Sequence, residues 1–191
     1  MNDQLPPATP NESSEDDTDA PSCREHMVDD WLTLQYADSN ASSDIPSAEQ
    51  LALWASTALS HEGHTPPFRP MCVRFCDASE IQALNRDYRD RDKPTNVLSF
   101  PAPAPVGLPP EVLAALDTND LTLGDLVVCT AVLRDEAQQQ GKSLPHHCAH
   151  LLVHGVLHLL GYDHIEEADA EDMETRERAI LSQLGIADPY A

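Results

Sequence analysis

The chain has 191 residues and a formal net charge of −22, from 33 acidic and 11 basic side chains. This length suits one domain plus a terminal segment, and no apolar run is long enough to span a bilayer. The excess of acid argues against nucleic-acid binding over a broad surface, because such binding depends on Lys and Arg meeting phosphates.

Residues 1–26 are rich in Pro, Ser, Asp and Glu and contain almost no large apolar side chains. This composition cannot bury enough surface to offset the entropy lost on ordering, so we expect an acidic disordered tail before a single domain over 27–191. The tail lacks the basic start and apolar stretch of a signal peptide. Five cysteines without a C-x-x-C pair favour free thiols in a reducing compartment.

The first half of the domain alternates between strands and helices. Residues 31–36 alternate apolar and polar side chains, which is typical of a half-buried strand. Ser47 and Gln50 have the spacing of a capping box at the start of a helix over 48–62. The next predicted elements are a strand over 72–76, a helix that is capped by Asp77 or Ser79 and ends near Arg89, and a strand over 96–100.

Proline on both sides of the strand at 96–100 places it near an edge of the sheet. Residues 101–122 form the least regular stretch, with at most one helical turn at 111–116. The remaining predicted elements are a strand over 123–129 and helices over 130–140, 144–160 and 166–184. We therefore expect an α+β fold, with a small mixed β-sheet of about four strands packed against about five or six helices.

His154, His158 and His164, in the run HGVLHLLGYDH, have the spacing of a transition-metal site. On a helix, His154 and His158 share one face with Cβ atoms about 5–6 Å apart, which suits two imidazoles on one ion. Gly161 can adopt the positive φ that ends a helix, so His164 can fold back onto the same ion. Three neutral nitrogen donors leave one position open, as in catalytic zinc sites. We expect this site at the end of a central helix; the alternative is a set of ordinary helix histidines.

The residue after the first histidine separates this run from a zinc-peptidase motif. The motif H-E-x-x-H-x-x-G-x-x-H has the same spacing, and its Glu is the general base. Here Gly155 stands at the Glu position and can neither accept a proton nor orient a water. The pattern therefore argues against proteolysis and favours another hydrolytic substrate.

Two residues beside the run have open interpretations. His150 lies four residues before His154 and is either an alternative ligand or a donor to a ligand. Since Gly161 and His164 already complete a triad, the ligand role is disfavoured. Asp163 either orients an imidazole or accepts a proton, or it is a turn aspartate bonded to its own backbone.

Three segments carry a family resemblance: LNRDYRDRDKPTNVLSFP at 84–101, LGDLVVC at 123–129 and the histidine run. Together they closely resemble the YbeY family of bacterial rRNA-maturation endoribonucleases, over roughly 30–190. The resemblance implies a cytoplasmic, metal-dependent endoribonuclease specific for single-stranded RNA. It also implies action in rRNA maturation, including the 3′ end of the small-subunit RNA, and in ribosome quality control. The implied partners are single-stranded RNA, rRNA and the ribosome or its proteins, with no membrane.

The resemblance assigns the metal to the three histidines and a functional role to Arg89. A guanidinium offers a fork of donors that matches phosphate oxygens, so Arg89 is expected to hold the scissile phosphate. The alternative is a surface ion pair with Asp87, Asp90 or Asp92. We expect one Zn²⁺ ion, although imidazole triads also accept nickel and other divalent transition metals.

Basic side chains gather within residues 74–93, interleaved with aspartates. This stretch is either a local RNA-binding strip or a solvated loop of mixed charge. Two functions from other classes also stay open. One is a metal-dependent hydrolase of another class, such as a peptidase, which Gly155 opposes. The other is a ribosome-assembly binding protein whose metal is structural.

Overall fold

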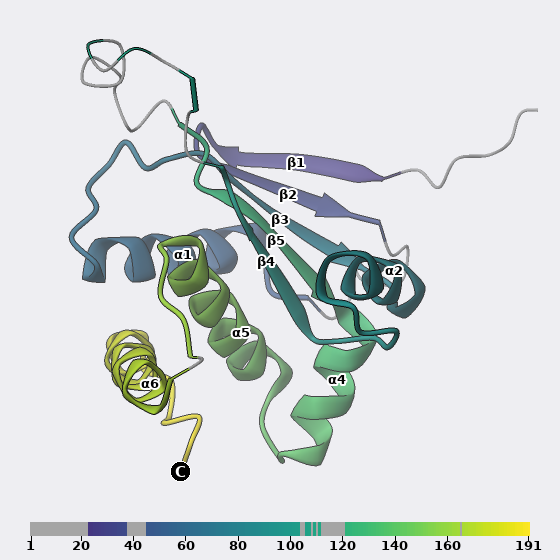
Figure 1. Cartoon of the computed structure of the whole chain (residues 1–191). Helices are drawn as coiled ribbons and strands as arrows, with labels where there is room; N and C mark the ends of the chain where they lie inside the picture. Colours follow the sequence, from purple (N-terminus) through teal and green to yellow (C-terminus); the bar gives the residue numbers. More distant parts are fainter. Residues whose placement is uncertain are drawn as a thin grey trace, which may run out of the picture.

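The computed structural model describes residues 23–37, 45–103, 106–107, 109, 111, 121–164 and 166–191. These residues form one five-stranded sheet with helices on both sides (Figure 1). The strands are β1 (Arg24–Asp29), β2 (Leu32–Tyr36), β3 (Met71–Cys76), β4 (Val97–Pro101) and β5 (Gly124–Cys129). The described helices are α1 (Ala48–His61), α2 (Ala78–Arg89), α4 (Thr130–Gln139), α5 (Leu144–Leu159) and α6 (Glu167–Gln183). The predicted α+β class with a mixed sheet is confirmed.

The sheet has the strand order β1-β2-β3-β5-β4. The pairs β2–β3 and β3–β5 are parallel, whereas β1 and β4 pair antiparallel with their neighbours at the two edges. The edge position predicted for β4 from its flanking prolines is confirmed by the strand order. The physical reason is that Pro101, at the end of β4, has no amide hydrogen to donate to a further strand.

The sheet has five strands, whereas about four were predicted, and β1 is the additional one. Five of its six residues are exposed, so no apolar alternation marks it in the sequence. It forms instead by backbone pairing with β2, with Arg24 opposite Tyr36 and Met27 opposite Thr33. Since β1 begins at Arg24, the strand overlaps the end of the tail predicted over 1–26. Residues 1–22 lie outside the described residues, and their disorder stays a prediction.

The predicted helix starts agree with the structure. At α1, the Ser47 hydroxyl accepts from the Gln50 amide at 3.4 Å and the Gln50 side chain accepts from the Ser47 amide at 3.1 Å, which is a capping box. At α2, Asp77 is the N-cap and accepts from the Glu80 amide at 2.9 Å. Ser79, the other candidate cap, lies inside the helix and donates its hydroxyl to Asp77 at 2.7 Å.

The two faces of the sheet have separate apolar clusters. Leu126 and Val128 of β5 belong to the larger cluster, which includes buried side chains of α1, α5 and α6. Val127 and Cys129, the intervening residues, belong to the smaller cluster with Ile81 of α2. Figure 1 shows the same division: α1, α5 and α6 lie on one side of the sheet and α2 on the other, with α4 continuing from the end of β5.

Helix α5 is the central helix of the larger cluster and packs against α1, α4, α6, β4 and β5. Ser143 caps it by accepting from the His146 amide at 3.3 Å, and a proline lies in its first turn, where no amide hydrogen is needed. Most of its side chains are buried. A helix fixed on so many sides can hold functional groups rigidly.

Two further predictions concern the irregular stretch 101–122 and membrane-spanning segments. The helical turn expected at 111–116 falls almost wholly outside the described residues. Among the helices that the structure describes, none is long and apolar enough to cross a membrane.

Candidate metal centre

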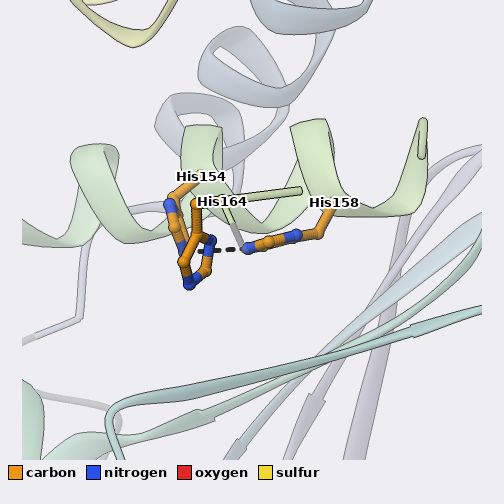
Figure 2. Close-up of side chains that lie close together, drawn as sticks. All are labelled: His154, His158 and His164. Atoms are coloured by element: carbon orange, nitrogen blue, oxygen red, sulfur yellow. Dashed lines mark hydrogen bonds between the residues drawn. The ribbon is translucent and has the colours of Figure 1, made fainter. Parts of the chain in front are cut away.

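His154 and His158 project from the same side of α5, and His164 lies on the turn that follows this helix (Figure 2). The Nε2 atoms of His154 and His158 are 3.1 Å apart. The ring centroid of His164 lies 5.5 Å from that of His154 and 4.9 Å from that of His158. One ring nitrogen from each histidine lies within 4.8 Å of the other two. The structure thus brings together all three histidines predicted as ligands.

The turn after α5 places the third histidine. Gly161 has a φ of 97°, as predicted, and the next amide, of Tyr162, donates to the Leu157 carbonyl at 3.1 Å. The Tyr162 hydroxyl donates to the Glu62 carboxylate at 2.5 Å. Arg176 of α6 also binds Glu62, at 2.7 Å, and its guanidinium carbon lies 4.5 Å from the centre of the Tyr162 ring. The turn is therefore anchored to the end of α1 and to α6.

The partners of the Nδ1 atoms determine which ring nitrogens of the two helix histidines are free. His154 Nδ1 lies 2.8 Å from a Glu177 carboxylate oxygen, and His158 Nδ1 lies 2.9 Å from the Tyr162 carbonyl oxygen. A carbonyl and an ionised carboxylate only accept, so both Nδ1 atoms carry a proton. When such an imidazole is neutral, its lone pair is on Nε2.

Two lone pairs at 3.1 Å repel each other unless a cation or a proton lies between them. Two nitrogen ligands of a tetrahedral zinc ion, each at about 2.0–2.1 Å, lie about 3.3 Å from each other. The observed separation is therefore close to that of two ligands on one ion. Three imidazoles also form a donor set that suits a divalent transition metal.

The surroundings of His158 favour the neutral imidazole that metal binding requires. Burial lowers the pKa of His158, and the neighbouring His154 lowers it further. Burial alone would raise the pKa of Glu177, but hydrogen bonds from His150, His154 and Tyr190 outweigh it and hold this pKa at about 2. Glu177 is therefore an ionised acceptor behind His154.

Glu177 is a site residue that the sequence reasoning did not identify. It is 1% exposed, although α6 is rich in acidic residues that face solvent. The signal that could have revealed it is its position on the buried stripe of α6. The buried residues of this helix are Met173, Glu177, Ile180 and Leu181, so a carboxylate occupies an apolar position.

The hydrogen bonds of His150 and Asp163 distinguish between the roles that the sequence left open for them. His150 Nε2 lies 2.9 Å from Glu177 and 3.3 Å from the Tyr190 hydroxyl, and His150 is not part of the histidine cluster. The Asp163 side chain accepts from the His164 amide at 2.7 Å, which is the turn role that the sequence offered as an alternative.

Arg89 is the last residue of α2 and is exposed. Within the described residues, no hydrogen bond or ion pair joins it to the histidines, and none joins it to the three aspartates named as alternative partners. Asp87 binds Arg86 at 2.8 Å instead, and Asp92 accepts from Gln82 at 3.0 Å. The structure thus leaves the Arg89 guanidinium available, but it does not place it in contact with the cluster.

The basic stretch around Arg89 is partly neutralised. Arg74 forms a two-pronged pair with Glu80, at 2.6 and 3.2 Å, and Arg86 is paired with Asp87. Arg89 is therefore a stronger candidate phosphate ligand than Arg74 or Arg86, whose guanidinium groups already have carboxylate partners.

Gly155 faces the sheet rather than the histidine cluster. A Cβ atom at this position would lie 2.8 and 2.9 Å from the two terminal carbons of Leu126, which is fully buried in β5. A glycine thus lets α5 approach β5 closely without displacing the Leu126 side chain. The peptidase motif needs Glu at this position, so the packing supports the sequence argument against proteolysis.

Comparison with known protein families identifies the family of this chain. A sequence model of the family described as Endoribonuclease YbeY matches residues 35–185. The chain belongs to the YbeY endoribonuclease family. The resemblance predicted from the three sequence segments is confirmed, and so is the enzyme class that this family name states.

YbeY relatives are similar to this chain over most of their own length. Endoribonuclease YbeY of Chromohalobacter salexigens is 49% identical over 160 residues, which cover 84% of this chain and 97% of the relative. The proteins of the same name from Alteromonas mediterranea and Halorhodospira halophila are 49% and 50% identical, over 78% of this chain and 87% and 91% of theirs. A solution structure of TM1509 from Thermotoga maritima has 20% identity and a TM-score of 0.47, and the match covers 83% of this chain and 97% of that one.

Proposed function

We propose that this YbeY-family chain is a metal-dependent endoribonuclease that cuts single-stranded RNA. The observation that carries the proposal is the convergence of three histidines, two of which have Nε2 atoms 3.1 Å apart. Membership of the family supports RNA as the substrate. The sequence resemblance supports a cytoplasmic role in rRNA maturation, including the 3′ end of the small-subunit RNA, and in ribosome quality control, with the ribosome as partner.

His154, His158 and His164 would hold one divalent transition-metal ion. We propose Zn²⁺, with nickel or another ion of the same class as the alternative, because imidazole accepts several such metals. When bound, the ion supplies Lewis-acid polarisation of a phosphate oxygen. His164 is exposed, whereas the His154 side chain is 25% exposed, so solvent reaches the cluster most easily at His164. A flexible single strand can bend into such a site, whereas a stiff duplex has to be deformed first.

Arg89 would bind the scissile or a neighbouring phosphate. Its guanidinium never loses its charge and has no carboxylate partner among the described residues. The bound charge would offset negative charge that grows on the phosphate oxygens in the transition state. Glu177 is not available as a general base, since it is occupied by its own three hydrogen bonds. The RNA 2′-hydroxyl or a water molecule is left as the nucleophile.

Cleavage of matched RNA substrates tests the function directly. Zinc-loaded protein is expected to cut an unstructured RNA and to cut the same sequence in a duplex at least about tenfold more slowly, because opening or bending a duplex requires a few kcal/mol. Removal of the ion with a chelator should abolish cleavage, and re-addition should restore it. Product ends identify the nucleophile, since a 2′,3′-cyclic phosphate indicates the 2′-hydroxyl. Equal cleavage by chelated protein would overturn the proposal.

The Arg89→Ala variant tests the phosphate ligand. Loss of one charged donor is expected to lower kcat/KM by roughly 10²–10³-fold. RNA affinity falls as salt rises, and the slope of log binding constant against log salt concentration should become shallower by about 0.7. This is the contribution of one phosphate contact in a single strand. Zinc affinity should not change. Arg86→Ala is the matched control, because Arg86 lies on the same helix but is paired with Asp87. An unchanged slope in Arg89→Ala would remove Arg89 from the RNA contact.

A further inference from the structure

We propose that Glu177 is a positioning residue of the metal centre, which holds His154 in the tautomer whose Nε2 is free to bind the ion. This inference rests on the proposed function, because it assigns a role to Glu177 in the same site. It also extends the site from α5 and its turn to α6, a helix that contributes no proposed ligand.

The geometry around Glu177 supports a specific role for each of its oxygens. Oε1 lies 2.8 Å from His154 Nδ1, and Oε2 lies 2.9 Å from His150 Nε2. The Tyr190 hydroxyl also donates to Oε2, through a short hydrogen bond. The carboxylate is 1% exposed, so water does not compete for these bonds. A buried carboxylate needs such donors, and here one of the donors is a candidate ligand.

Residues near the C-terminus hold Tyr190, one of the donors to Glu177, in place. The guanidinium carbon of Arg178 lies 4.9 Å from the centre of the Tyr190 ring, and the Lys142 ammonium donates to the Pro189 carbonyl at 2.6 Å. These contacts hold Tyr190 over Glu177. The orientation of the carboxylate is therefore fixed from the far side, independently of the histidine cluster.

A carboxylate behind a ligand histidine has two effects on the metal site. It accepts the Nδ1 proton, so that Nε2 is the nitrogen that binds, and it makes the imidazole a stronger donor. Glutamine at position 177 would keep the size of the side chain but not these effects. Three donors, from His150, His154 and Tyr190, would then face one amide oxygen and one amide NH₂ group, so at least one donor would lose its acceptor.

Metal binding by the Glu177→Gln variant tests the inference. We expect zinc affinity, measured by competition with a chromophoric chelator, to fall about 10–100-fold, which is the effect of losing such an outer partner. Cobalt-loaded protein should show altered visible absorption bands, because the orientation of one ligand changes. Nitrogen-15 NMR of the histidine side chains should show that His154 is no longer held in the Nδ1-protonated tautomer. A general loss of packing would not change this tautomer alone.

Controls separate this role from a structural one. Glu136→Gln on α4 alters a similar pair, with Nε2 of His147 at 2.9 Å. His147 lies on α5 but outside the cluster, so this variant should leave zinc affinity unchanged. Should Glu177→Gln fail to fold by circular dichroism, Tyr190→Phe removes one donor to the carboxylate, and the same measurements should show a smaller shift in the same direction.

The outcomes distinguish the inference from the proposed function. Wild-type zinc affinity and an unchanged His154 tautomer in Glu177→Gln would overturn the inference and leave the proposed function in place. A wild-type protein that binds no divalent transition metal would overturn the proposed function and the inference together. Weaker binding with a changed tautomer supports both.

Discussion

His158→Ala protein is expected to lose tight metal binding and RNA cleavage together. His158 supplies one of the two Nε2 atoms that lie 3.1 Å apart, and its own Nδ1 is fixed by the Tyr162 carbonyl at 2.9 Å. Removal of a ligand should weaken zinc binding by more than the roughly 10–100-fold expected for the loss of a group that hydrogen-bonds to a ligand, such as Glu177. Without the ion, cleavage should fall to background, because the charge that polarises the phosphate is absent.

Zinc titration and an RNA cleavage assay on the same preparation check this expectation. His146→Ala is the matched control, since His146 lies on the same helix, is exposed and does not belong to the cluster. Full cleavage by a metal-free His158→Ala protein would contradict the whole account of the site.

The same variant separates a catalytic site from a structural one. A structural metal contributes directly to folding, so its loss unfolds a small domain. Here the larger apolar cluster joins α1, α5 and α6 to the sheet without any help from the histidines. We therefore expect His158→Ala and chelated wild-type protein to keep their secondary structure by circular dichroism. Unfolding on chelation would favour the assembly protein with a structural metal.

The histidine cluster was predictable because its geometry is local. A spacing of four residues on a helix and a glycine that ends that helix determine where three side chains lie, with little influence from the rest of the fold. The structure agrees at each step, from the common face of His154 and His158 to the positive φ of Gly161. The N-caps of α1 and α2 were predictable for the same reason.

What was not predicted depends on contacts between distant parts of the chain. Glu177 reaches His154 from 23 residues away, and Glu62 reaches the turn tyrosine, Tyr162, from 100 residues away. Neither pairing follows from spacing, because both depend on how α1, α5 and α6 pack. The strand β1 was missed because an exposed edge strand forms through its backbone, and its side chains carry no pattern.

Arg89 illustrates a further limit of sequence reasoning. The family resemblance assigns it a phosphate, and the structure places it at the end of α2, a helix of the smaller apolar cluster. Its role therefore depends on the path of the bound RNA, which the salt dependence of Arg89→Ala can report.

Gly155→Glu, the change that restores the peptidase motif, is expected to destabilise the fold and to give no peptidase. Even a Cβ atom at position 155 would approach the fully buried Leu126 side chain to 2.8 Å. Overpacking of this kind costs about 1–3 kcal/mol. The glutamate would also bury a carboxyl group without a partner, at roughly 2–7 kcal/mol when it is neutral, so we expect a loss of more than about 3 kcal/mol.

Urea unfolding of smaller substitutions isolates the steric cause. Gly155→Ala should destabilise by about 1–3 kcal/mol, although alanine is favoured over glycine in a helix by about 1 kcal/mol. Leu126→Ala alone should cost about 2–5 kcal/mol through the cavity it leaves. If the two side chains compete for one space, the double variant will be more stable than the sum of the single effects predicts. Additive effects, or a stable Gly155→Glu protein that hydrolyses peptides, would show that packing on Leu126 is not what keeps glycine at this position.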